Sequence, residues 1–199
     1  MPVPVVSASS YQGETPQVPS AGWATPAARA GRAAVSGYLA ASWSDFSVAV
    51  VGASAALTGL LFVAVSINIE QILAIGTLAG RALSTMILFI IPLVVGVLVL
   101  VPDQSSTTLG LELGGTGLAA GGCLLRINRP GGRGELEPRS GWLLLRLLPS
   151  VTITVFLVLA GAGLIMRTGG GLYWVAPAII EAFIGGLATA WVLLVEIRR

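Results

Sequence analysis

A run of twenty residues without a charge, from Val48 to Ile67, is the feature that most constrains what this chain can fold into. At about 1.5 Å of rise per residue, a helix of that length spans roughly 30 Å, the thickness of a bilayer's hydrocarbon core. Further predominantly apolar stretches lie at 82–101, 143–166 and 172–195. Several such runs in one chain indicate a polytopic membrane protein.

The composition excludes most soluble and enzymatic classes. Hydrophobic residues make up 55% of the 199 residues and charged ones only 10%, against about 25% in ordinary soluble domains. All 11 basic residues are arginine, and histidine, the usual general base and metal ligand, is absent. The single cysteine, Cys123, allows no internal disulfide. We therefore expect no catalytic residues, no metal, no cofactor and no nucleic-acid partner.

The chain divides into two parts. Residues 1–45 are rich in Pro, Ala and Ser, and we expect a disordered N-terminal tail. Residues 46–199 are expected to form an all-α, polytopic transmembrane helical bundle. Its five predicted spans cover about 47–73, 82–101, 107–125, 142–166 and 172–196.

The third of these spans is the least regular. Its glycines and Glu112 make it less favourable for a helix over 107–125 to insert into the membrane unaided. The alternative is four spans plus a re-entrant segment at this position. Five spans are preferred, because otherwise a segment containing six leucines would lie in water without a core.

Arginines set the orientation, since they concentrate in cytoplasmic loops. Five spans place eight arginines on one side and three, Arg29, Arg32 and Arg167, on the other. Four spans give nine against two, so the count alone slightly favours four. Both arrangements place the 126–141 loop and the C-terminus in the cytoplasm; with five spans the N-terminus lies outside.

Two carboxylic acids are predicted to lie within spans, where ionisable groups are costly and commonly functional. Glu181 lies one turn after Pro177, and Glu112 lies about five residues into the third span. Either side chain is expected to bind a proton or cation in a transport cycle or to bond to a neighbouring helix in a polar network. A second set, expected at the cytoplasmic rim, includes Glu70, Arg146 and Glu196, and Arg146 is a plausible partner for either glutamate.

Small residues four positions apart let helix backbones approach closely in lipid. Such pairs recur in the first, third and fifth spans, and the predicted packing residues are Gly52, Ala56, Gly59, Gly117, Gly121 and Gly186. We expect them to mediate tight contacts within one chain or between subunits.

Three segments together resemble a known family. They are Ala53–Asn68, the Leu-Gly-Leu-Glu-Leu run at 109–113, and the ending Ala190–Arg198. The chain over 47–199 is similar to small, uncharacterised five-span integral membrane proteins of high-GC bacteria, some of which are labelled modulators of the FtsH protease. The resemblance implies that 109–125 is a true span and that the protein resides in the bacterial plasma membrane, and it implies no catalytic residues.

These observations predict a non-enzymatic integral membrane accessory, regulatory or structural protein. Its expected partners are the lipid bilayer and either further copies of itself or another membrane protein. The alternative is a small proton- or cation-coupled transporter or channel subunit that uses Glu181 and Glu112.

Overall fold

The computed structural model describes residues 36–74, 76–128 and 147–197. These residues are almost entirely helical, and no strand occurs among them. Five helices are long and apolar enough to cross a membrane. The elements, in chain order, are η1 (Ala40–Trp43), α2 (Ser44–Ile67), α3 (Ile69–Ala74), α4 (Gly76–Leu100), α5 (Ser106–Ile127), α7 (Leu148–Met166), η4 (Gly171–Trp174) and α8 (Val175–Ile197).

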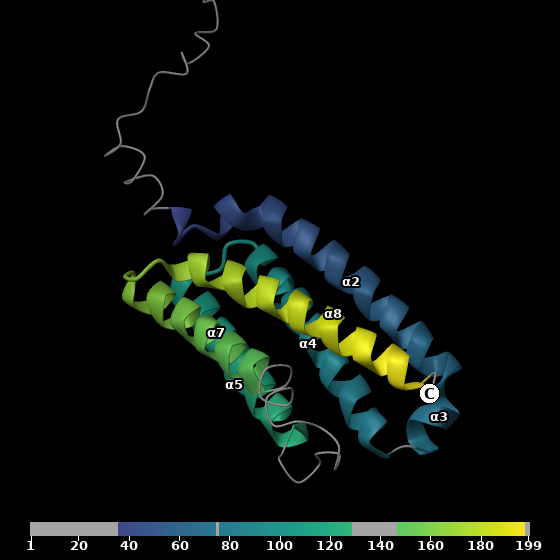
Figure 1. The fold of residues 1–199 in the computed structure, drawn as a ribbon. Helices are drawn as coiled ribbons and strands as arrows, with labels where there is room; N and C mark the ends of the chain where they lie inside the picture. The colour runs from purple at the N-terminus through teal and green to yellow at the C-terminus, as the bar shows by residue number, and fades with distance from the viewer. Residues whose placement is uncertain (1–35, 75, 129–146, 198–199) are drawn as a thin grey trace, which may run out of the picture.

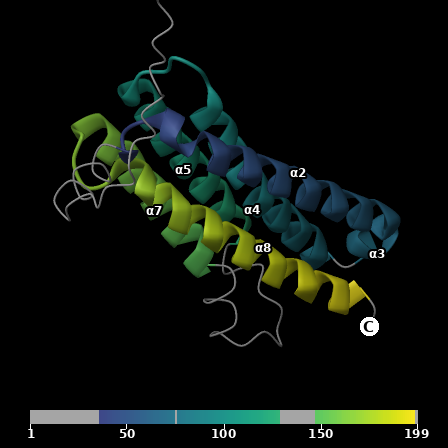
Figure 2. The same cartoon turned by 90° about the horizontal axis from the view of Figure 1, so that it is seen from above.

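The five long helices form an antiparallel bundle with α4 near its middle (Figures 1 and 2). Helix α4 packs against α2, α5 and α8, while α7 packs against α5 and α8. The helix α2 therefore lies at one edge of the bundle and the α5–α7 pair at the other. The all-α, five-helix membrane bundle expected from the apolar runs is confirmed.

The predicted first span, 47–73, is divided at Asn68 into α2 and the short α3. The Asn68 side chain donates a hydrogen bond to the Ala64 carbonyl oxygen, and its backbone N–H bonds to Val65, three residues back, which tightens the last turn. In α3, Ile72 is buried while Glu70 and Gln71 are exposed. This short helix turns the chain from α2 into α4.

The segment in doubt, 107–125, is a regular helix of full spanning length, α5. Ser105 caps its start, because the Ser105 hydroxyl accepts a hydrogen bond from the Thr108 N–H at 3.1 Å. The turn before it is short, with Asp103 in the left-handed conformation at φ 54°. Helix α5 runs along α7, and its Leu109 and Leu113 are buried in the core of the bundle. The structure thus favours five spans over four with a re-entrant segment.

The chain enters and leaves the bundle at opposite ends, as an odd number of spans requires. Residues 36–43, which we call the strap, pack on the α7–α8 loop: Gly37 O accepts from Leu172 N–H at 2.9 Å, and Tyr38 Oη accepts from Gly170 N–H at 3.1 Å. Trp43 stacks edge-on against Tyr173. The C-terminal end of α8 lies at the far end of the bundle (Figure 1).

Part of the segment predicted as a disordered tail therefore has a defined structure, because η1 and the first residues of α2 precede residue 46. The strap is held by backbone hydrogen bonds and aromatic contacts to the 170–173 region, which composition does not reveal. Residues 1–35 lie outside the described residues.

Candidate functional site

Glu181 is the clearest polar feature inside the membrane-spanning part. It lies six residues after the start of α8, roughly 9 Å along the helix, and its side chain is partly buried. The Thr152 hydroxyl of α7 contacts both Glu181 Oε1 and, at 2.6 Å, the carbonyl oxygen of Leu148. The two helices thereby meet through a carboxyl–hydroxyl pair within the membrane.

A pocket with a volume of about 360 Å³ opens beside this pair, between α7 and α8. Among the described residues that line it, Glu181 alone is ionisable, and the others are apolar: Leu148, Pro149, Phe156, Pro177, Ile180, Ile184, Gly185 and Ala188. Gly185 of α8 lies against Pro149 of α7 here, and a Cβ atom at this position would make an ordinary van der Waals contact with the proline ring at 3.4 Å. One polar group in an apolar cavity of this size is typical of a small-molecule site.

Glu112 has a different partner. Its Oε2 accepts a hydrogen bond from Gln104 Nε2, in the turn between α4 and α5. Within the described residues, no hydrogen bond or ion pair joins Glu112 to Glu181. The two predicted intramembrane acids therefore occupy separate sites, one near the start of α5 and one between α7 and α8.

Of the three residues predicted to form ion pairs at the cytoplasmic rim, the structure describes the side chain of only one. Glu70 is exposed on α3. Arg146 and the side chain of Glu196 lie outside the described residues, so the pairing of Arg146 with Glu70 or Glu196 stays a prediction.

Three of the predicted packing glycines make contacts inside the bundle. A Cβ atom on Gly117 would lie 2.8 Å from Leu157 Cβ, and one on Gly121 would overlap the Thr154 side chain, both on α7. A Cβ atom on Gly186 would lie 2.5 Å from the Phe89 ring of α4. These glycines let α5 approach α7 and let α8 approach α4.

The other three, Gly52, Ala56 and Gly59, point away from the bundle. All three are exposed, and a Cβ atom added at Gly52 or Gly59 would have nothing within 4 Å. Ser54 and Leu61, which are buried, lie on the opposite side of α2, given the ~100° between successive helical residues. We call Gly52, Ala56 and Gly59 the outer stripe.

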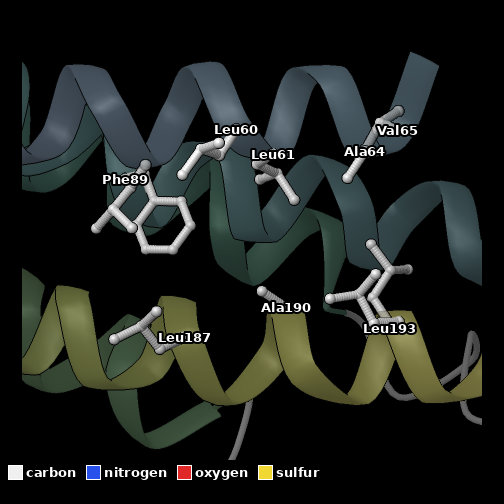
Figure 3. A pocket seen from close by; sticks show the side chains of 10 residues that line it. Leu60, Leu61, Ala64, Val65, Phe89, Leu187, Ala190 and Leu193 are labelled. Carbon is white, nitrogen blue, oxygen red and sulfur yellow. The ribbon is translucent and has the colours of Figure 1, made fainter. Parts of the chain in front are cut away.

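An apolar groove of about 150 Å³ separates α2 from α8 (Figure 3). Its side chains come from three helices, with Leu61 and Ala64 on α2, Leu187 and Leu193 on α8, and Phe89 of α4 between them. Along this part of its length, α2 is supported mainly by α4. Consistently, only 17% of the most apolar stretch of α2 is buried, against 50% for α4.

Sequence reasoning missed Thr152, Gln104 and Tyr38, although each forms a polar contact between elements. For Thr152 a signal existed, because hydroxyl side chains within apolar spans commonly bond across helices. Nothing in the sequence identifies which acceptor such a hydroxyl finds.

No protein-family model, curated protein or solved structure matches this chain. Among the described residues, no group of three or more His, Cys, Asp or Glu side chains could hold a metal ion.

Proposed function

We propose that this protein is a non-enzymatic accessory protein of the membrane that associates with another membrane-spanning helix through α2. The outer stripe is the observation that carries the proposal. Small residues four apart expose the backbone of a helix to close approach, which is the main route to helix association in lipid. Gly117 and Gly121 of α5 and Gly186 of α8 lie against other helices of the chain, whereas a Cβ atom on Gly52 or Gly59 of α2 would meet no described residue within 4 Å.

The position of α2 supports the same conclusion. It is the least buried of the five spanning helices and lies at the edge of the bundle. Helix α5 also has outward glycines, including Gly115, but its opposite face is held along α7. A partner helix on α2 would complete the packing of the helix that this chain supports least.

The test compares two glycine-to-leucine substitutions on lipid-facing positions. Gly59→Leu should reduce association between copies labelled at the exposed Cys123 by at least about tenfold, since leucine prevents the backbones from approaching. Resonance energy transfer in liposomes measures self-association, and co-purification from native membranes without detergent measures a partner of another kind.

Gly115→Leu on α5 is the matched control, because a Cβ atom there also has nothing within 4 Å. It should leave association unchanged in both assays. The proposal fails if Gly59→Leu behaves like the unmodified protein in both, or if the two variants lose association equally.

We further propose that the protein lies in the bacterial plasma membrane with its N-terminus outside and its C-terminus in the cytoplasm. The excess of arginines at the end where α5 ends and α7 begins supports this orientation. A reporter enzyme that works only in the cytoplasm should be active at the C-terminus and inactive at the N-terminus. Equal activity at both positions would contradict the five-span arrangement. Activity at the N-terminus alone would mean that the protein has the opposite orientation in the membrane.

The alternative of a proton- or cation-coupled transporter stays a prediction. The carboxyl of Glu181, beside a membrane pocket, is the observation in its favour. Such a transporter should show proton- or cation-dependent flux in proteoliposomes, and Glu181→Gln should abolish that flux. Flux unchanged by Glu181→Gln would remove this role from Glu181.

A further inference from the structure

We infer that the pocket between α7 and α8 is a binding site for a membrane-soluble amphiphile that carries a hydroxyl group, and that Glu181 accepts the hydrogen bond of that hydroxyl. The inference rests on the geometry of the Thr152–Glu181 pair and on the shape of the pocket. It is independent of the role proposed for α2, which lies on another part of the bundle.

The hydrogen-bond geometry determines what Glu181 can offer to a ligand. Thr152 has a single hydroxyl proton, but two acceptors, Leu148 O and Glu181 Oε1, lie within reach. The Thr152 hydroxyl is therefore shared between the Leu148 carbonyl oxygen and Glu181 Oε1, and Glu181 accepts at Oε1. The second carboxyl oxygen, Oε2, is an acceptor that Thr152 does not use.

That second oxygen makes no hydrogen bond to any other described residue, and Glu181 lines the pocket. In a hydrocarbon environment no water is present to satisfy it, so a ligand donor gains more there than at an aqueous surface. A hydroxyl group supplies that donor without carrying a charge into the membrane.

The rest of the pocket matches the apolar part of such a molecule. Its walls are formed by aliphatic and aromatic side chains, among them Phe156, Ile180 and Ile184. The volume of about 360 Å³ lies within the usual range for small-molecule sites. The pocket is lined by other residues of α8 than the groove shown in Figure 3, whose described lining residues are all apolar.

The test uses the full chain in proteoliposomes and a long-chain primary alcohol that carries a photoreactive diazirine. The second probe is the methyl ether of the same molecule, which has no donor. After irradiation, mass spectrometry identifies the labelled peptides. The alcohol should label the pocket, at 148–156 and 177–188, about tenfold more than the ether does.

Three variants test whether labelling by the alcohol depends on its hydrogen bond to Glu181. Glu181→Leu should lower alcohol labelling about tenfold, to the level of the ether. Glu181→Gln should stay within about twofold of the unmodified protein, because the amide has a similar shape and keeps an oxygen that can accept a hydrogen bond. Glu112→Leu removes the other intramembrane acid and should leave labelling unchanged.

Three outcomes would overturn the inference. Equal labelling by alcohol and ether would mean that the pocket holds an acyl chain without a polar contact. Loss of labelling in Glu181→Gln would mean that an oxygen acceptor at this position is not sufficient to bind the alcohol. An equal loss in Glu112→Leu would mean that labelling reports the stability of the bundle, which thermal unfolding of each variant measures independently.

Discussion

Replacing Gly161 of α7 by alanine should lower the free energy of unfolding by about 3 kcal/mol, one of the largest effects expected of any single methyl group in this bundle. The added Cβ atom would overlap the carbonyl oxygen of Gly110 on α5 and lie 3.0 Å from the Gly114 backbone nitrogen. Backbone atoms cannot rotate aside as a flexible side chain can. The two helices would have to separate, so the contact that holds α5 in the bundle would weaken along its length.

Thermal unfolding in detergent micelles, followed by circular dichroism, measures this effect. Gly115→Ala on α5 is the control, because it adds the same methyl group where nothing lies within 4 Å. It should cause no loss and could add up to about 1 kcal/mol from helix propensity. If both variants unfold at the same temperature, close packing of α5 on α7 is not what stabilises the pair.

Replacing Gly171 by alanine should release the strap from the α7–α8 loop. Gly171 has a left-handed backbone at φ 52°, which costs an alanine about 1–2 kcal/mol, and its Cβ atom would lie 2.5 Å from Gly37 O. That oxygen is the acceptor for the Leu172 N–H. We expect hydrogen exchange at the Leu172 amide to become about thirtyfold faster, the factor that corresponds to ~2 kcal/mol.

Gly169→Ala is the control that distinguishes the cost of a left-handed alanine from the steric overlap with the Gly37 carbonyl oxygen. Gly169 is also left-handed, at φ 74°, but a Cβ atom there has nothing within 4 Å. It should destabilise the loop slightly and leave the Leu172 amide protected. Equal exchange in the two variants would show that the strap does not depend on the close approach of Gly37 and Gly171.

The positions of the spans could be predicted because they depend on the solvent alone. A backbone in hydrocarbon must satisfy its own hydrogen bonds, so an uncharged run of sufficient length becomes a helix whatever its neighbours are. The boundaries were less predictable. The break at Asn68 depends on one side chain that bonds back to Ala64, and the start of α4 at Gly76 lies several residues before its apolar run.

The small-residue pattern predicted close helix contact but not the partner. Gly117 and Gly52 each have a small residue four positions later, yet Gly117 lies against Leu157, whereas a Cβ atom on Gly52 would meet no described residue within 4 Å. A 3.6-residue period defines which residues share a face of a helix. It does not determine whether that face meets a helix of the same chain, another protein or lipid.

The sequence by itself therefore determined the class of protein, the approximate positions of its most apolar spans and the residue types within them, because transfer from water into lipid acts on each segment separately. It left the choice between five spans and four open at 107–125, where the structure has a full-length helix. Only the tertiary structure decided which side chains meet. Thr152 and Glu181 are 29 residues apart, and α7 and α8 must turn back on each other before the two can bond. The exposure of the outer stripe on α2 within the described residues likewise follows from how the helices are arranged around α4, which no local pattern encodes.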